Sequence, residues 1–402
     1  MTTPRKIGFG TVFAVLLVWS YFARPVYDFA RIAAGRVWDA QVEKHARPFV
    51  RQDYDAVMDA ATEQAAEINQ YFNVQRRTAA NAPAIRALDF SGETAYVRST
   101  DALRTYLRGS LGYFPENVPP PTEAVQETPL GEDDLATYTR LRVPITPGIH
   151  SIGVYMRPKN RPGKLPLVIA AHGRSGPPDR VANGKVTILA HHNRDLGRGA
   201  LERGYAVWEP MFVFYAKGEP EDLRERLSAR ALEAGTTLPA VEILKTVRTL
   251  DALVQRPEID STRVAMVGMS YGGFYTLYTT ALEPRIKAAV VAAYFNDREA
   301  VLDASEPAGF SDWRFPDSLT LLRDPFIAAL VCPRALEIQA GSQDQLFPLA
   351  GARRTAPLAA QFYEKLHVGD RFRFVDFVGR HDFNGREAWD FLDQHLGQNA
   401  VE

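Results

Sequence analysis

The sequence predicts an α/β fold in which helices flank a mostly parallel β-sheet. Short apolar runs alternate with helical patterns along the second two thirds of the chain, which is typical of βαβ units. Most of these runs are apolar at nearly every position, as expected of strands that are covered on both faces. The length of 402 residues accommodates one such domain of about 250 residues together with an accessory segment.

Residues 1–24 favour a membrane anchor. Between Ile7 and Ala23 the sequence is uncharged and largely apolar, and Trp19 and Tyr21 lie near its end. The length is at the short limit of a membrane-spanning helix, and aromatic rings are common at membrane interfaces. We therefore expect an uncleaved anchor with an exported body. A cleaved secretion signal, which would release the protein, and a buried helix are the alternatives.

Residues 25–114 predict a helical accessory segment. From Gln52 to about Arg77, apolar residues recur at helical spacing, with charged or amide residues between them. The proline-rich stretch "YFPENVPPPTEAVQETP" can continue neither a helix nor a central strand, so residues 115–129 are predicted to be a linker. Residues 130–397 then form the α/β domain.

This domain is expected to open with two antiparallel strands and to continue with parallel ones. The first two segments alternate apolar and polar residues: "YTRLRVPI" and "HSIGVYMRP". The later strands are mostly apolar: "LPLVIAAHG", "GYAVWEP", "RVAMVG", "KAAVVAAYF", "PRALEIQAG" and "FRFVDFVG". Helical spacing identifies "AVEILKTVRTLDALVQ" and the closing "GREAWDFLDQHL". The segment "DLRERLSARALE", from Asp222, predicts a solvated helix face or part of a lid.

The single cysteine, Cys332, excludes an intramolecular disulfide. The apolar residues on either side of it, from Ala328 to Pro333, predict a further buried strand. No neighbouring residue type would stabilise a thiolate, so we expect an inert thiol in the core.

Composition and motifs exclude several classes of function. The chain carries 47 basic and 48 acidic side chains, a formal net charge of −1, which disfavours nucleic acid as a partner. No P-loop and no dinucleotide-binding G-x-G-x-x-G is present, and no cofactor is expected. His191, His192 and Asp195 are close in sequence, but HExxH and cysteine pairs are absent, so no metal site is predicted.

The strongest functional motif is G-x-S-x-G, which Gly268, Ser270 and Gly272 form between a buried strand and a helix. In this context the motif predicts a nucleophile elbow, where a strained turn exposes the serine oxygen at a helix N-terminus. Glycines remove side chains that would collide with the neighbouring strand and helix. The sequence therefore predicts Ser270 as a nucleophile.

A nucleophilic serine needs a base to take its proton and a third group to orient that base. Where this elbow occurs, the acid and the histidine follow the serine in the chain. We predict Asp344 as the acid and His381 as the base, because each lies in a loop at the carboxyl end of a predicted strand. Asp297 is the alternative acid, and Asp382 is badly placed to orient the histidine beside it.

The charge that develops on a substrate carbonyl needs preorganised hydrogen-bond donors. We predict the backbone N–H of Tyr271, the residue after the nucleophile, as one donor. The second is expected from "HGRSG", after the strand that ends near Ala171, as the backbone N–H of Arg174. His172 is expected to have a structural role.

Four motifs together resemble the α/β-hydrolase superfamily, and within it the branch of dienelactone hydrolases and acetyl xylan esterases: "HGRSG", "GMSYGG", "CPRALEIQAGSQDQLFP" and "GRHDFNGREAWDFLDQHL". The resemblance covers residues 135 to 397. It implies an α/β-hydrolase fold and a carboxylic-ester hydrolase that needs no cofactor. It also implies that Ser270, Asp344 and His381 occupy the triad positions.

The sequence departs from that branch around the predicted substrate pocket. Pro210 is followed by "MFVFYAKGEP" where many relatives carry an aspartate, and Arg174 stands where relatives often have an uncharged residue. Aromatic residues on the surrounding loops predict a pocket for an acyl group or a ring, and they are Phe212, Phe214, Tyr215, Tyr271, Phe295 and Trp313. Ordinary core packing is the alternative role for these aromatic residues.

The sequence thus predicts a membrane-anchored serine esterase acting on a small-molecule ester. Two other functions remain open from the sequence. One is a prolyl-oligopeptidase-like peptidase, in which S-Y-G-G also occurs, although no propeller domain is visible. The other is a membrane-tethered scaffold without catalytic activity. The natural ester and the oligomeric state do not follow from the sequence.

Overall fold

The computed structural model describes residues 30, 33–37, 40, 54–79, 83–113, 119, 121–174, 196–214, 219, 222–303 and 313–397. The predicted anchor, residues 7–23, lies outside these ranges. Within them, no helix combines the length and the apolar character needed to cross a membrane. The chain divides into two compact units, Met1–Phe72 and Asn73–Glu402.

Helix α2 (Tyr54–Ala79) corresponds to the helix predicted between Gln52 and Arg77. The side chains that the structure describes in α2 are almost all exposed, including those of Met58, Ile68 and Phe72.

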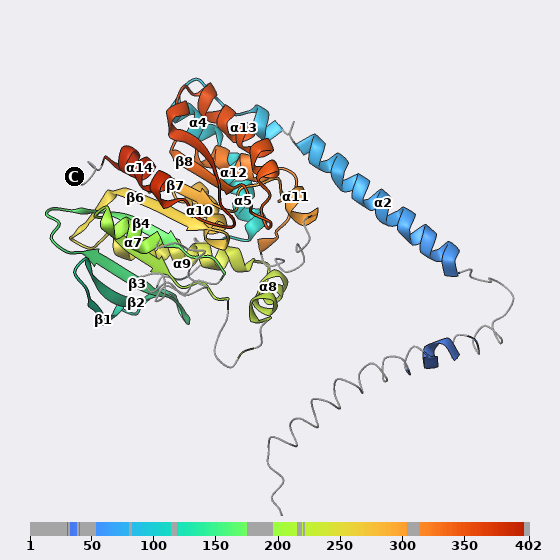
Figure 1. Ribbon diagram of the computed structural model, residues 1–402, viewed down its shortest axis with the longest axis horizontal. Coiled ribbons are helices and arrows are strands. Elements are labelled where there is room, and N and C mark those ends of the chain that lie inside the picture. Colours follow the sequence, from blue (N-terminus) through green and yellow to red (C-terminus); the bar gives the residue numbers. More distant parts are fainter. Residues whose placement is uncertain are drawn as a thin grey trace, which may run out of the picture. The chain divides into compact units, whose positions relative to one another are not determined.

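The described part of the second unit contains a nine-stranded sheet with the order β1-β2-β3-β5-β4-β6-β7-β8-β9 (Figure 1). The strands are β1 (Gln126–Glu132), β2 (Ala136–Thr146), β3 (Ile149–Pro158), β4 (Leu165–Ala171), β5 (Ala206–Pro210), β6 (Ile259–Met269), β7 (Ile286–Ala292), β8 (Ala335–Gly341) and β9 (Phe372–Phe377). Strands β1, β2, β3 and β5 pair antiparallel, and all pairs from β5 through β4 to β9 are parallel. The predicted α/β architecture with an antiparallel start is confirmed.

Helices cover both faces of this sheet. They are α7 (Leu196–Glu202), α8 (Leu223–Glu233), α9 (Leu238–Leu253), α10 (Tyr271–Leu282), α11 (Arg298–Asp303), α12 (Asp324–Val331), α13 (Leu349–Lys365) and α14 (Gly385–Leu396). In β4, Leu167 and Ile169 join the larger apolar cluster, whereas Val168 and Ala170 join a second cluster with residues of α7 and α14. Because successive strand residues point to opposite faces, this double burial explains the continuous apolar run.

The helical segment before the sheet contributes to the same core. It comprises α3 (Pro83–Arg86), α4 (Glu93–Ser99) and α5 (Asp101–Leu111). Leu103, Leu107 and Leu111 follow one face of α5 and are buried in the larger cluster. The helices predicted between residues 25 and 114 therefore include part of the main unit. Strand β1 begins within residues 115–129, the stretch predicted to be a linker.

The strand predicted before Cys332 is wrong, because residues Asp324–Val331 form helix α12. A short apolar run has no period that separates a buried strand from a buried helix. Every residue of α12 is buried, so the helix needs no polar face, and Pro325 in its first turn favours a helix start. Cys332 itself is buried as expected, and burial raises the pKa of its thiol to about 12.

Candidate active site

Ser270 lies at a sharp turn between strand β6 and helix α10. Its backbone has φ 59° and ψ −120°, a conformation that costs energy for any residue other than glycine. The turn is fixed on both sides, because the Ser270 N–H donates to the Ala292 carbonyl at 2.9 Å and the Ser270 carbonyl accepts from Phe274 N–H at 2.9 Å. The backbone thus makes the strained strand-to-helix turn that the motif predicts, and the role of Ser270 as a nucleophile remains a prediction.

Gly272 is required at this turn by the closeness of strand β4. A Cβ atom at Gly272 would lie 1.9 Å from the Ala171 carbonyl oxygen, far inside van der Waals contact. The first turn of α10 therefore packs directly against the end of β4. Because Ala171 of β4 also pairs in register with Gly268 of β6, the loop after β4 and the elbow lie at the same edge of the sheet.

Asp344 and His381 form a hydrogen-bonded pair. The Nδ1 atom of His381 lies 2.8 Å from Oδ2 of Asp344. The other carboxylate oxygen, Oδ1, accepts hydrogen bonds from the backbone N–H groups of Leu346 at 2.9 Å and Phe347 at 3.0 Å. With Nδ1 donating to a carboxylate that is held in this way, Nε2 carries the lone pair that a general base needs.

The loops that carry these two residues are bonded to each other. The N–H groups of Ser342 and Gln343, after β8, donate to the carbonyls of Phe377 and Gly379, after β9, both at 2.8 Å. A Cβ atom at Gly341 would lie 2.1 Å from the Arg380 carbonyl oxygen. The main chains therefore approach closely, and the separation of acid and base is set by backbone contacts.

Asp297, the alternative acid in the sequence prediction, does not take this position. Its Oδ2 lies 3.3 Å from Nη2 of Arg354, in a pair exposed to solvent. Asp344 is instead almost completely buried beside the histidine. The structure thus brings His381 together with Asp344, and the catalytic role of the pair remains a prediction.

The two predicted oxyanion residues differ in their surroundings. The Tyr271 side chain is buried and stacks on Trp313, with ring centroids 4.7 Å apart. Arg174 follows β4, and its half-exposed side chain approaches Glu225 of α8 at 3.4 Å. Only the backbone N–H groups of Tyr271 and Arg174 are expected to act on substrate. The side-chain contacts matter because they help to hold each main chain in position.

His172 has the structural role expected from the sequence. It is buried, with Nδ1 at 2.7 Å from the Gly173 carbonyl, and its Nε2 accepts the Phe212 N–H at 3.1 Å. Burial lowers the pKa of His172 to about 4. A neutral His172 therefore joins the loop after β4 to the chain after β5.

Most aromatic residues predicted to line a substrate pocket are buried and do not line the pocket described below, and their role toward substrate remains a prediction. Phe212, Phe214 and Phe295 are each at most 4% exposed, and Tyr215 lies outside the described residues. Phe212 stacks on Tyr275 at 4.3 Å. The sequence places these residues on loops near the site. Large aromatic rings are stabilised most by burial, so they pack beneath the loops. Whether a ring points into the core or toward the pocket depends on residues far away in the sequence.

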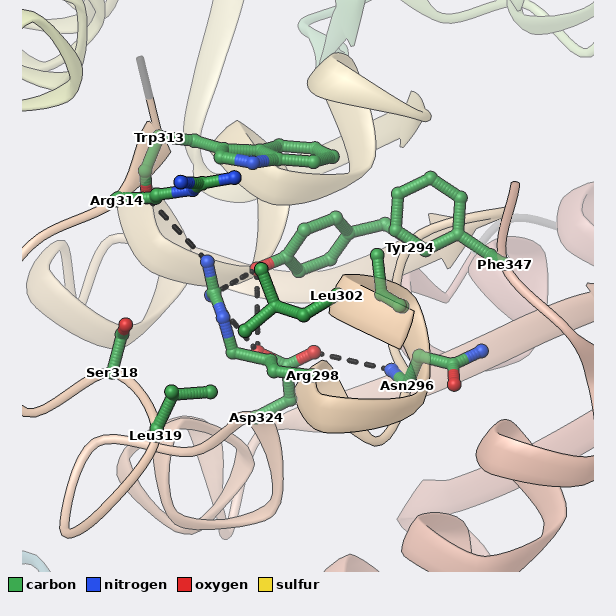
Figure 2. Close-up of a pocket in the computed structure, with 11 residues that line it drawn as sticks. Tyr294, Asn296, Arg298, Leu302, Trp313, Arg314, Ser318, Leu319, Asp324 and Phe347 are labelled. Carbon is green, nitrogen blue, oxygen red and sulfur yellow. Dashed lines mark hydrogen bonds and ion pairs between the residues drawn. The ribbon is translucent and has the colours of Figure 1, made fainter. Parts of the chain in front are cut away.

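Trp313 does line a pocket, which has a volume of about 100 Å³ and opens to solvent. Figure 2 shows its residues, which are Tyr294, Asn296, Arg298, Val301, Leu302, Trp313, Arg314, Ser318, Leu319, Asp324 and Phe347. Of these, only Trp313 was predicted. Phe347 lies three residues after Asp344 in the motif "CPRALEIQAGSQDQLFP". Its position near the site could therefore have been predicted from that motif.

Helix α8 has the solvated face predicted for this segment, and it also buries one charged residue, Arg224. Its side chain is 1% exposed and donates to the Tyr275 hydroxyl and the Val213 carbonyl, each at 2.6 Å. The guanidinium carbon lies 4.3 Å from the Phe214 ring centre and 5.1 Å from that of Tyr271. The polar composition of the segment gave no sign of this burial, because the partners of Arg224 lie on other elements.

Within the described ranges, no group of three or more metal-ligating side chains comes together. His191, His192 and Asp195 lie outside those ranges.

Comparison with known proteins supports the resemblance. The acetyl xylan esterase (AXE1) family matches residues 241–305, which contain the elbow. The Bacillus subtilis (strain 168) protein "Putative hydrolase YtaP" is 23% identical over 236 residues, covering 56% of this chain and 76% of that protein.

Solved structures share the fold at low sequence identity. Methylesterase BT1017 has a TM-score of 0.59 and 18% identity, covering 78% of this chain and 66% of its own. A "putative acetyl xylan esterase (BF1801)" from Bacteroides fragilis NCTC 9343 has a TM-score of 0.59 and 14% identity. The match covers 82% of this chain and 89% of that protein. The chain therefore has the α/β-hydrolase fold, and the resemblance read from its motifs is confirmed.

Proposed function

We propose that this α/β-hydrolase is a serine esterase that cleaves small-molecule carboxylic esters. The observation that carries the proposal is the bonded pair of Asp344 and His381 at the same sheet edge as the strained elbow of Ser270. The acetyl xylan esterase match and the esterases of the same fold support a carboxylic-ester hydrolase. Because those relatives are named as acetyl xylan esterase or methylesterase, acetyl and methyl esters are the first substrates to test.

In the proposed reaction, His381 Nε2 takes the proton of Ser270 as its oxygen attacks the ester carbonyl. Asp344 holds the imidazole in the required tautomer and stabilises the imidazolium. The backbone N–H groups of Tyr271 and Arg174 donate to the oxyanion of the tetrahedral intermediate. His381 then gives the proton to the departing alcohol, which leaves an acyl group on Ser270. Water activated by the same histidine hydrolyses this acyl-enzyme.

Neither alternative function gains support from the structure. No comparison reported above favours a peptidase. A scaffold protein without catalytic activity would have no need of the hydrogen-bonded pair of Asp344 and His381. Turnover of proline-containing peptides by the purified protein, at a rate matching that of esters, would bring the peptidase back.

We retain the uncleaved anchor at residues 7–23, with the domain exported, as the proposed localisation. Its basis is the uncharged apolar sequence between Lys6 and Arg24. Membrane fractionation followed by carbonate extraction tests it. Recovery of a shortened chain in the soluble exported fraction would instead show a cleaved signal.

The serine mechanism is tested with a fluorophosphonate probe, which labels activated serines. Wild type should be labelled and should hydrolyse p-nitrophenyl acetate, and Ser270→Ala should lose both. Ser261→Ala is the matched control, because Ser261 is exposed on β6, the strand that leads to the elbow. Folded wild-type protein that neither labels nor turns over any ester would sink the proposal.

A further inference from the structure

The pocket beside the proposed catalytic residues has two aromatic walls that it shares with them. The Phe347 ring stacks on His381, with centroids 5.7 Å apart and planes at 19°. The Trp313 ring stacks on Tyr271 at 4.7 Å and 22°. Trp313 and Phe347 meet edge to face at 5.7 Å. The pocket therefore adjoins both the proposed base and the residue that follows the nucleophile.

The polar groups at the closed end of the pocket bond to one another. Arg298 donates to the Tyr294 hydroxyl at 2.8 Å and lies 3.6 Å from Asp324. Asp324 accepts the Asn296 N–H at 3.1 Å and is 1% exposed. Figure 2 shows the Arg298 guanidinium directed toward the Trp313 main chain. A polar ligand group would have to compete with these bonds, so this end favours no polar ligand.

The remaining wall is mostly aliphatic, although Arg314 and Ser318 also line the pocket. Val301 and Leu302 of α11 and Leu319 contribute the aliphatic part, and all three are partly buried. A pocket of about 100 Å³ with such walls has room for a short aliphatic chain. The hydrophobic effect favours burial of an apolar group there, and more so for each added CH₂. The surface that a ligand meets is therefore mainly apolar.

We infer that this pocket holds the acyl group of the ester, and that the preferred acyl group is apolar and larger than acetate. The inference rests on the proposed esterase function and deepens it. In that mechanism the acyl group stays bonded to Ser270 through the intermediate, whereas the alcohol must leave before water attacks. A pocket closed by Arg298 and Asp324 suits the group that stays.

The experiment narrows the pocket and varies the acyl chain. We measure kcat/KM for p-nitrophenyl acetate, butyrate, hexanoate and octanoate with wild type and Leu302→Trp. Wild type should prefer hexanoate to acetate. The indole should lower the ratio of kcat/KM for hexanoate to kcat/KM for acetate at least about tenfold, the scale of discrimination by one lost methylene site.

Two further variants make the result decisive. Leu358→Trp is the matched control, because Leu358 is exposed on α13 and does not line the pocket. Leu319→Trp narrows the pocket from another segment, so the test does not depend on the folding of one variant.

Three results would overturn the inference. They are a wild-type preference for acetate over all longer chains, an equal loss at every chain length in both pocket variants, and a loss that appears only when the alcohol of an acetate ester is lengthened. The fluorophosphonate label separates this failure from that of the esterase proposal. Labelled Ser270 with unchanged chain-length preference overturns only the pocket, whereas an unlabelled folded protein overturns the function.

Discussion

At the scale of single residues, steric space around the elbow decides which amino acids can occupy it. The motif predicts that glycine at position 272 avoids a steric clash. The structure shows the clashing group, because the Ala171 carbonyl lies where a Cβ atom of residue 272 would stand. Ser270 keeps its positive φ because strand and helix fix the chain on either side. The turn itself was predictable from residues adjacent in sequence, whereas its contacts with Ala171 and Ala292 involve other strands and are visible only in the structure.

Gly272→Ala should therefore lower the free energy of unfolding by about 4 kcal/mol or more and abolish esterase activity. The methyl group would collide with backbone that cannot move without opening β4. Gly109→Ala is the control, since nothing lies within 4 Å of its Cβ and it sits inside α5. There alanine should stabilise the protein by about 0.5–1 kcal/mol. Urea denaturation checks both, and equal stabilities would contradict the steric argument.

His172 should make stability depend on pH. In the unfolded chain its pKa is near 6.5, and burial lowers the folded pKa to about 4. Between these values the unfolded state binds more protons, so the stability contributed by neutral His172 is present above pH 6.5 and is lost as pH falls to about 4. The slope from this one group is at most about 1.4 kcal/mol per pH unit.

The comparison variant is His172→Gln, which cannot titrate. The free energies of unfolding of both proteins, measured at pH 7.5, 6, 5 and 4.5, should approach each other as pH falls. Only wild type loses the contribution of neutral His172, whereas the carboxylates contribute equally to both proteins. Parallel curves would show that His172 takes up its proton in the folded protein as readily as in the unfolded one.

At the scale of elements, strands were predicted better than their surroundings. Strands β4 and β6 are apolar on both faces, and that pattern is local and unambiguous. Helix α12 was mistaken for a strand because complete burial removes the helical period. The pocket residues from α11 and α12 were missed because their meeting depends on contacts between segments far apart in the chain.

Helix α8 illustrates the same limit and yields a prediction. Arg224→Met should remove the two buried hydrogen bonds that Arg224 donates to the Val213 carbonyl and the Tyr275 hydroxyl. Their loss should lower the free energy of unfolding by about 3 kcal/mol. Because Arg224 lies over the Tyr271 ring, kcat for ester hydrolysis should fall more than KM rises.

Arg226→Met, on the same helix, is the control, since its pair with Asp222 is exposed at the surface. Stability there should change by less than about 0.5 kcal/mol. Arg224→Lys should restore part of kcat, because it returns one donor and the charge. Thermal melts and steady-state kinetics decide, and a wild-type kcat in folded Arg224→Met would exclude a positioning role.

At the scale of the whole molecule, the larger apolar cluster joins the helices before the sheet to helices that pack on it, including α12. The Tyr96 hydroxyl of α4 donates to the Ala329 carbonyl of α12 at 2.9 Å, which joins segments 233 residues apart. Sequence reasoning assigned α4 to an accessory segment because no local signal reveals such a partner.

Cys332 lies in this shared core and should report its opening. At pH 8 the native protein should resist iodoacetamide, because the thiol is buried and its pKa is raised to about 12. In denaturing urea it should be alkylated at the rate of a free thiol. Mass spectrometry of timed samples measures this. Rapid alkylation under native conditions would show that the region around α12 opens without global unfolding.

The bonds between the loops after β8 and β9 have a consequence for how this enzyme could be re-engineered. The proposed acid and base belong to one continuous stretch of chain, from Ala335 to Phe383, whose two loops are joined by main-chain hydrogen bonds. We expect that stretch to be exchangeable between relatives only as a whole, because transplanting either loop alone would separate the carboxylate from the imidazole. In such chimeras the nucleophile would come from one parent and the proton-transfer machinery from the other.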